Sequence, residues 1–319
     1  MRIIFMGTPD FAVASLDALV KNKFDIVGVV TAADKPSGRG QQMNQSPVKK
    51  YALENNLKLL QPHNLKAADF IAELQSLRAD LQIVVAFRML PEAVWNMPPE
   101  GTYNLHASLL PKYRGAAPIN WAVINGEQES GVTTFKLKHE IDTGNILLQE
   151  KIQIGSTDTA GDLHDKLMKA GANLVLETVR RIRKKMEEGS ELKFVTQQDS
   201  LANHAPKLNK DLCRINWHLK AEEIYNLIRG LSPYPTAFTE LQNEDGQVKA
   251  VKIFFAGYAT TVHEKPVGTI DTDNRNFLNV FCCDGILEIK DIQLEGKKRM
   301  KVQEFLKGFK FTAGTKMIG

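Results

Sequence analysis

The fold is decided by residues 3–31, which read IIFMGTPDFAVASLDALVKNKFDIVGVVT. Two short apolar runs, 3–6 and 26–31, enclose residues 11–20, whose apolar side chains recur at helical spacing. This order predicts a strand, a helix and a second strand, which is the repeating unit of parallel sheets. An α/β domain is therefore expected in this part of the chain.

The same pattern continues further along the chain. Residues 81–87 form an unbroken apolar run, typical of a strand buried on both faces of a parallel sheet, and 102–105 and 132–137 predict two more strands. A Ser-Pro pair, which suits a helix cap and first turn, opens the helix expected over 46–55. A longer helix is expected over 158–189, where a glycine ends it.

Periodicity is lost over residues 190–207, where polar and turn-forming side chains predict a connector that runs over the surface. Beyond it, short apolar runs predict four strands, over 248–258, 267–270, 277–283 and 286–294. Asp284-Gly285 separates the last two and is a common hairpin-turn pair. We expect a small β-barrel and therefore two domains, 1–189 and 208–319, joined by the connector.

Composition narrows the class of protein. The 319 residues suit two domains, since single cores stop growing near ~250 residues. With 43% hydrophobic and 24% charged residues, no run approaches the ~18 apolar residues of a membrane span, and the first residues do not resemble a signal peptide. A cytoplasmic protein that contacts no membrane is expected.

Cysteine and charge usage add two expectations. The three cysteines, Cys213, Cys282 and Cys283, fit neither a disulfide framework nor a metal site, so no metal is expected. The net charge is +4, and residues 290–319 hold eight Lys and Arg against three Asp and Glu. Excess positive charge in this segment permits an anionic partner.

The first strand leads into residues 7–11, Gly-Thr-Pro-Asp-Phe, which lack the G-x-G-x-x-G pattern that binds dinucleotides. No NAD is expected. Open α/β sheets bind ligands at the carboxyl ends of their strands, so the residues at and after the end of the 102–105 strand are the first candidates for a site.

Three polar residues lie at predicted strand ends. Asn104 and His106 are two positions apart and so face the same side of an extended segment, and Asp142 lies on a turn after a later strand. Taken singly, they could be a turn cap, a satisfied interior histidine and a turn carboxylate. Taken together, they match acyl transfer to an amine, which needs donors for an oxyanion and a proton for the displaced nitrogen.

Residues 104–111 read NLHASLLP, and this run resembles the signature of the folate-dependent formyltransferases. The Arg39 loop, the segment 114–119 and the Asp142 turn are similar to those members of the family that formylate initiator methionyl-tRNA. The resemblance spans residues 1–309. It implies a Rossmann-like catalytic domain followed by an OB-like domain that binds tRNA.

The resemblance also implies residue roles. It assigns catalysis to Asn104, His106 and Asp142, with the amide and the imidazole stabilising the oxyanion and Asp142 holding His106 in place. It assigns the folate site to Ser108, Leu109, Leu110 and Pro111, and tRNA contacts to Arg39, Lys297, Lys298 and Arg299. The implied formyl donor is 10-formyltetrahydrofolate, the implied acceptor is initiator tRNA bound at its acceptor stem, and the implied state is a monomer.

Other interpretations remain open at this point. A sugar-nucleotide N-formyltransferase would use the same donor, catalytic residues and fold, with an amino sugar as acceptor. A non-catalytic RNA-binding protein would not need His106. For Arg39 and the basic residues near Lys297, the alternative is a solvated surface without a ligand.

Overall fold

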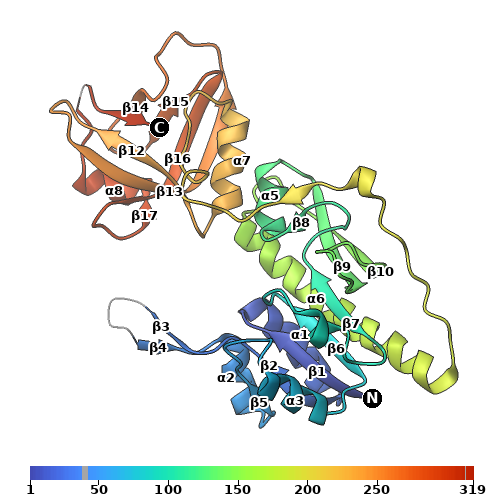
Figure 1. The fold of residues 1–319 in the computed structure, drawn as a ribbon. Coiled ribbons are helices and arrows are strands. Elements are labelled where there is room, and N and C mark those ends of the chain that lie inside the picture. The colour runs from blue at the N-terminus through green and yellow to red at the C-terminus, as the bar shows by residue number, and fades with distance from the viewer. Residues whose placement is uncertain (38–41, 313) are drawn as a thin grey trace. The chain divides into compact units, whose positions relative to one another are not determined.

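A computed structural model describes residues 1–37, 42–312 and 314–319, which form two compact units (Figure 1). The first unit comprises Met1–Gly115, Ser130–Gln153 and His164–His204. The second unit comprises Ala116–Glu129, Ile154–Leu163 and Ala205–Gly319. The chain thus passes between the units several times, and the domain boundaries expected from the sequence stay a prediction. Within the described residues, no helix has the length and apolarity needed to cross a membrane.

The first unit contains a large sheet with flanking helices. Its strands are β1 (Arg2–Gly7), β2 (Asp25–Val30), β3 (Lys35–Ser37), β4 (Gln42–Asn44), β5 (Leu59–Leu60), β6 (Leu81–Val85), β7 (Thr102–His106), β8 (Arg114–Gly115), β9 (Glu129–Lys136) and β10 (Ile146–Gln153). Its helices are α1 (Asp10–Lys21), α2 (Pro47–Glu54), α3 (Ala68–Ser76), α4 (Glu92–Trp95), most of α6 (Ala160–Glu188) and the 3-10 turn Asp199–Leu201.

The large sheet has the strand order β10-β9-β7-β6-β1-β2-β5. The pairs β1–β2, β1–β6, β2–β5 and β6–β7 are parallel, whereas β7 and β9 are antiparallel. This mostly parallel order confirms the predicted α/β, Rossmann-like class.

Both faces of β1 are buried from Ile3 onward, as its apolar sequence predicts. Ile4 and Met6 of β1 share a core cluster with Phe70 and Leu74 of α3. On β7, Leu105 lies against α6, so close to Gly171 that a Cβ there would come within 2.7 Å of Leu105 Cδ2. Because side chains alternate along a strand, Asn104 and His106 face the side of β7 opposite to α6.

The helix signals read from the sequence are also confirmed. The Ser46 hydroxyl accepts a hydrogen bond from the Lys49 amide (3.0 Å) and so caps α2. Helix α6 ends at Glu188, and Gly189 follows with φ 68°, the left-handed conformation typical of a helix end. Strand β6 is shorter than predicted, because it stops at Val85 and Ala86 has a positive φ of 47°.

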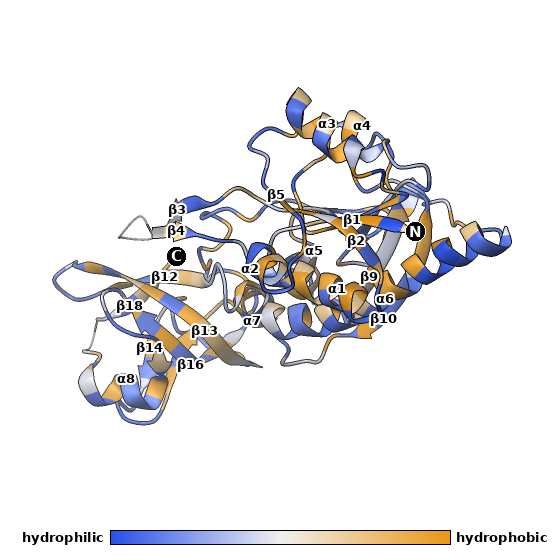
Figure 2. Ribbon diagram, turned by 90° about the horizontal axis from the view of Figure 1, so that it is seen from below, coloured by the Kyte–Doolittle hydropathy of each residue, from blue (hydrophilic) through white to orange (hydrophobic). Residues whose placement is uncertain are grey.

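The second unit is built around an antiparallel sheet. Its elements are α5 (Pro118–Ile124), β11 (His204–Ala205), α7 (Ala221–Leu231), β12 (Ala237–Gln242), β13 (Val248–Thr260), β14 (Ile270–Thr272), β15 (Leu278–Phe281), β16 (Gly285–Leu294), β17 (Met300–Lys301), α8 (Val302–Gly308) and β18 (Lys316–Ile318). In Figure 2, β13 and β16 carry both hydrophobic and hydrophilic residues, and burial alternates along most of β16, as expected for a strand with one buried face.

The sheet of the second unit is nearly closed. Its order is β14-β15-β16-β13-β12-β18, with β17 paired to β16. The two ends approach each other where the Met317 amide donates to the Gly268 carbonyl (2.9 Å) and Thr269 bridges to Lys316. The predicted barrel is therefore confirmed.

Helix α5 packs against α7 although the two are far apart in sequence. The Asn120 side-chain amide donates to the Gly230 carbonyl (2.8 Å), and a Cβ on Gly230 would lie 2.5 Å from Ile124 Cγ1. A glycine on α7 thus allows the close approach of the two helices.

The predicted Asp284-Gly285 turn is displaced by one residue. Cys282 N donates to the Gly285 carbonyl (2.9 Å), so the two central residues are Cys283 and Asp284. Gly285 is instead the first residue of β16, where a Cβ would lie 2.1 Å from the Ala259 carbonyl oxygen. The strand expected over 267–270 is also misplaced, since β14 spans Ile270–Thr272.

Candidate active site

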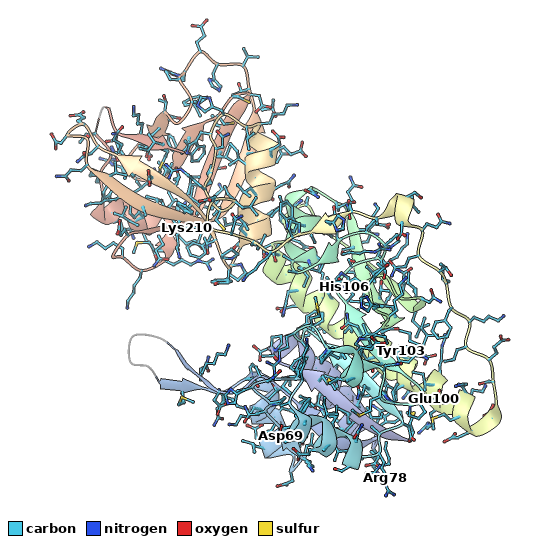
Figure 3. The ribbon with its side chains drawn as sticks, viewed as in Figure 1. Asp69, Arg78, Glu100, Tyr103, His106 and Lys210 are labelled. Carbon is cyan, nitrogen blue, oxygen red and sulfur yellow. The ribbon has the colours of Figure 1, made fainter. Side chains whose placement is uncertain are left out.

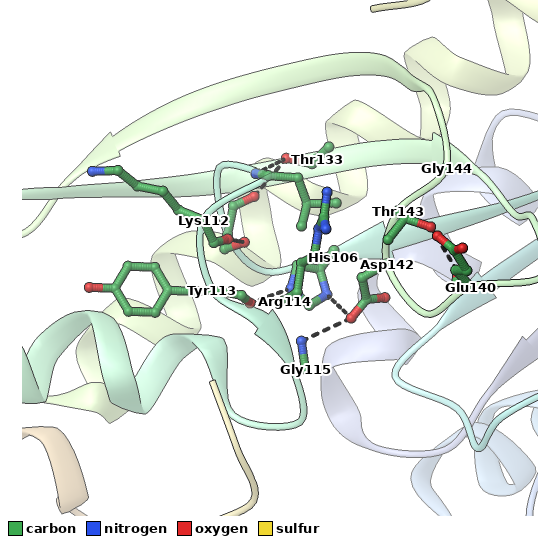
Figure 4. A network of polar contacts seen from close by, with 12 residues as sticks. His106, Lys112, Tyr113, Arg114, Gly115, Thr133, Glu140, Asp142, Thr143 and Gly144 are labelled. Carbon is green, nitrogen blue, oxygen red and sulfur yellow. Dashed lines mark hydrogen bonds and ion pairs between the residues drawn. The ribbon is translucent and has the colours of Figure 1, made fainter. Parts of the chain in front are cut away.

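Two of the three predicted catalytic residues meet at the end of β7. His106 is buried, with 6% of its surface exposed, and its ring lies between the Tyr113 carbonyl and the Asp142 carboxylate (Figure 4). Nε2 is 2.8 Å from Tyr113 O, and Nδ1 is 3.9 Å from Asp142 Oδ2. The Tyr113 carbonyl accepts a hydrogen bond from Nε2, whereas 3.9 Å is too long for a hydrogen bond and makes Asp142 an ion-pair partner of Nδ1.

Asp142 reaches His106 from a tightly folded turn. Its φ of 54° is left-handed, which Asp and Asn tolerate better than most residues. Its Oδ2 also accepts a hydrogen bond from the Gly115 amide (2.9 Å). Two residues later, a Cβ on Gly144 would lie 1.8 Å from the Lys136 carbonyl oxygen, so the turn requires glycine there.

Asn104 is half-buried and comes from the same face of β7 as His106. Among the described residues, its side-chain amide has no hydrogen-bond partner, which leaves the N–H groups available to a ligand oxygen. The amide and the imidazole therefore lie on one strand face, and a carboxylate adjoins the imidazole. These are the donors and the orienting acid that acyl transfer requires.

The predicted folate residues lie on the loop after β7, but two of their side chains point into protein. The Ser108 hydroxyl donates to the Lys112 carbonyl (2.6 Å), and Leu110 is buried in a small cluster with Phe135 and Ile146. Leu109 and Pro111 are half-buried. The folate assignment stays a prediction, and for Ser108 and Leu110 it depends on backbone groups.

Thr133 and Gln149 hold this loop, and neither was among the residues predicted for the site. The Thr133 hydroxyl donates to the Ser108 carbonyl (2.6 Å) and accepts from the Leu110 amide (3.2 Å). Gln149 Nε2 donates to the Leu110 carbonyl (2.8 Å) and to Thr133 Oγ1 (2.9 Å). The available signal was the pair Thr133-Thr134 inside the strand predicted over 132–137, because a buried hydroxyl needs partners.

The connector also contacts this site, contrary to the expectation that it runs only over the surface. Gln197 is 9% exposed, and its Nε2 donates to the carbonyls of Asp142 and Gly144 (both 2.8 Å). Its Oε1 accepts from Arg114, which is 8% exposed. Most of the segment is exposed, as its polar composition suggested, but the side-chain amide of Gln197 bonds inside the protein.

A second feature of the first unit is a cavity of about 390 Å³ near the start of β7. It is lined in part by Glu100, Tyr103, Lys185 and Phe194, and Figure 3 labels Tyr103 and His106 toward the two ends of the strand. Burial, with a smaller effect of Glu100, raises the pKa of the Tyr103 phenol well above its usual value. None of the predicted site residues lines this cavity.

Of the predicted tRNA contacts, Arg39 lies outside the described residues. Lys297 and Lys298 are exposed on the turn between β16 and β17, and no ion pair involves them within the described part of the chain. Arg299 is differently placed, because it donates to both carboxylate oxygens of Asp291 (3.0 and 2.7 Å) and lies 4.3 Å from the Phe254 ring centroid. The role of all four residues in binding stays a prediction.

The ion pair at this turn changes the titration of both partners. Burial raises the pKa of Asp291, but the hydrogen bonds and charges of Arg299 and Lys301 outweigh it, and the pKa is lowered overall. The hydrogen bond to Asp291 correspondingly raises the pKa of Arg299. The guanidinium thus fixes the turn from which Lys297 and Lys298 project.

Comparison with known families agrees with this fold. A family model described as formyl transferase matches residues 1–179, and one described as formyl transferase, C-terminal domain, matches 207–310. The chain therefore belongs to the formyltransferase family, whose members are formyl-transferring enzymes.

Relatives of similar sequence indicate which kind of formyltransferase the chain is. A methionyl-tRNA formyltransferase of Bacteroides fragilis is 52% identical over 320 residues, covering 99% of this chain and 98% of the relative. One of Flavobacterium johnsoniae is 49% identical over 317 residues, covering 99% of both. These full-length relatives place the chain among the methionyl-tRNA formyltransferases of the family.

Solved structures share the fold at lower identity. WlaRD, a sugar 3N-formyl transferase, is 23% identical with a TM-score of 0.65, covering 93% of this chain and 99% of that one. HypX from Aquifex aeolicus, solved in complex with tetrahydrofolic acid, is 19% identical with a TM-score of 0.63, covering 98% of this chain and 48% of that one.

Proposed function

We propose that this protein transfers the formyl group of 10-formyltetrahydrofolate to the free amino group of methionine on initiator tRNA. The observation that carries the proposal is sequence identity. The chain is about 50% identical, over almost its whole length, to relatives named methionyl-tRNA formyltransferase. The site at the end of β7 supports the chemistry, because its groups suit acyl transfer.

The reaction forms a bond between the methionine nitrogen and the formyl carbon, and it breaks the bond from that carbon to the folate nitrogen. An α-amino group titrates near ~8, so an appreciable share is neutral and nucleophilic at physiological pH. As the amine attacks, the formyl oxygen becomes an oxyanion, for which the Asn104 amide is a donor. Protonated His106 stabilises the oxyanion by its positive charge, because its Nε2–H is donated to the Tyr113 carbonyl and its Nδ1 faces Asp142. The attacking amine loses one proton, the folate nitrogen gains one, and Asp142 keeps the imidazole oriented.

The remaining assignments extend this proposal. The folate pterin contacts residues 108–111, chiefly through backbone groups. The acceptor stem of the tRNA contacts Arg39, Lys297 and Lys298, because guanidinium and ammonium groups suit phosphates. The enzyme acts as a cytoplasmic monomer.

One assay tests the proposal. The protein is supplied with 10-formyltetrahydrofolate and with either charged initiator tRNA or an amino-sugar nucleotide, and formylation of each amine is measured. We expect formyl-methionyl-tRNA alone. Transfer to the sugar instead would favour the second candidate function, to which the fold shared with WlaRD lends support.

A further inference from the structure

The segment between α6 and the second unit supports both neighbours of the His106 ring, which are the Tyr113 carbonyl and the turn that carries Asp142. One support is Gln197, which lies 55 residues from Asp142 in sequence but donates to its backbone carbonyl (2.8 Å). The second N–H of the same amide donates to the Gly144 carbonyl (2.8 Å). These two bonds hold the turn that carries the Asp142 carboxylate at two of its backbone carbonyls, those of Asp142 and Gly144.

The orientation of the Gln197 amide is fixed from the other side. Its Oε1 accepts from Arg114 Nε (3.1 Å) and Nη2 (2.8 Å), and Arg114 Nη2 also donates to Asp199 Oδ1 (2.8 Å). Since a guanidinium only donates, the oxygen of the amide must face Arg114 and the nitrogen must face the turn.

The second support is Asn203. Its Oδ1 accepts from the Tyr113 amide, and its backbone carbonyl accepts from the Arg114 amide (3.0 Å). Tyr113 has a left-handed φ of 59°, and its carbonyl is the group that accepts from His106 Nε2 (2.8 Å). The connector thus holds the Tyr113 carbonyl on one side of the ring and the Asp142 turn on the other.

We propose that Gln197 is a positioning residue for the formyl transfer, because it aligns Asp142 with His106, and that Asn203 aligns the Tyr113 carbonyl in the same way. Neither side chain touches His106; each acts through one neighbour of the imidazole. The proposal rests on the proposed function, since it names residues that prepare the same site. A displacement of about 1 Å at a catalytic group can cost a factor of about 100 in rate.

The chemistry of the amide makes the proposal specific. Replacing Gln197 with Glu keeps the volume and the acceptor for Arg114 but removes the two N–H groups. A carboxylate would then face the carbonyls of Asp142 and Gly144, and the turn would lose both bonds. Gln198 provides a matched control, because it is the adjacent residue of the same type but is exposed.

The experiment compares the wild type, Gln197→Glu and Gln198→Ala in steady-state formylation of methionyl-tRNA. We expect Gln197→Glu to lower kcat about 10- to 100-fold with KM for the folate donor nearly unchanged, and Gln198→Ala to match the wild type. A kcat within twofold of the wild type for Gln197→Glu would overturn the proposal.

A second measurement separates positioning from loss of folding. Gln197→Glu is combined with Asp142→Asn, and the fall in kcat is compared with that in the native background. If Gln197 acts through Asp142, its substitution has little further effect in the double variant. An equal fold-loss in both backgrounds would assign Gln197 a merely structural role and overturn the inference.

The activity of the wild type in each assay separates a failure of the proposed function from a failure of the positioning role of Gln197. If it formylates an amino-sugar nucleotide and not the charged tRNA, the proposed function fails. The comparison of Gln197 variants is then made with that amine, and its outcome still decides the positioning role.

Discussion

The site at the end of β7 and the basic turn after β16 are both polar, but they are held in different ways. At the site, His106 is buried, and the bonds that place its neighbours join residues 27 to 90 positions apart. At the turn, the Arg299–Asp291 pair spans eight positions, and Lys297 and Lys298 are exposed. A group in the first region cannot be lost without leaving buried partners unsatisfied. Water replaces the ammonium group of Lys297 or Lys298, whereas the loss of Arg299 would leave the buried Asp291 without a partner.

The largest difference is expected for Asp142, the carboxylate that we propose takes part in catalysis. Asp142→Asn should fold normally, because Asn also tolerates the left-handed φ of 54° and can accept from the Gly115 amide. Without the negative charge beside His106, kcat should fall by about 100-fold or more. Single-turnover formylation measures this, with His106→Ala as the fully impaired reference. Turnover close to the wild type would remove Asp142 from the mechanism.

A pair of glycines tests how tightly each region is built. Gly144→Ala would place a Cβ 1.8 Å from the Lys136 carbonyl oxygen, so we expect a loss of about 1–3 kcal/mol in the free energy of unfolding and a lower kcat. Gly296→Ala meets nothing within 4 Å and carries only the strain of φ 74°, about 1 kcal/mol. Urea unfolding and activity measure both variants. Equal losses of activity in the two variants would contradict the expectation that the Asp142 turn is more tightly packed than the turn after β16.

Smaller effects are expected from the exposed lysines. Lys297→Ala and Lys298→Ala should each weaken tRNA binding a few-fold at low salt and reduce the slope of log affinity against log salt by about 1. Lys249→Ala, at an exposed lysine of β13, is the control. Binding titrations at several salt concentrations measure the slopes, and an unchanged slope would argue against phosphate contact at the turn.

The smallest effect is a pH dependence at the Asp291–Arg299 pair. Because the pKa of Asp291 is lowered in the folded protein, the pair stabilises the fold above the unfolded value of about 4. This stability is lost as the pH falls through the folded pKa. Thermal melts of the wild type and Asp291→Asn at pH 7, 5 and 3 should differ most at pH 7 and converge at pH 3. A difference in melting temperature that increases as the pH falls would contradict the predicted direction of the pH dependence.

Much of the first unit could be predicted from the sequence because its signals are local. The apolar runs of β1, β6 and β7 and the cap at Ser46 depend on neighbouring residues only. Strand β10 was missed because only its first residues are buried and the rest carry polar side chains. A half-exposed edge strand lacks the continuous apolar pattern of a central one.

The parts of the site that the sequence could not supply are those made by distant contacts. We predicted His106 and Asp142 as site residues from their places at strand ends and from the family resemblance, but nothing local indicates that Gln197 is buried against the Asp142 turn 55 residues earlier. The turn that we predicted at Asp284-Gly285 lies one residue earlier in the structure for a similar reason. Its glycine is needed for the close approach of Ala259 on a neighbouring strand rather than for the turn itself.

The packing of α5 on α7 has a consequence for synthesis of the protein. About a hundred residues separate the two helices, so at roughly 5–20 residues per second α5 leaves the ribosome about 5–20 s before its partner. During that interval the face of α5 that includes Asn120 and Ile124 has no α7 to cover it. The second unit therefore completes its core only late in translation, and the nascent chain carries an uncovered helix in its middle until then.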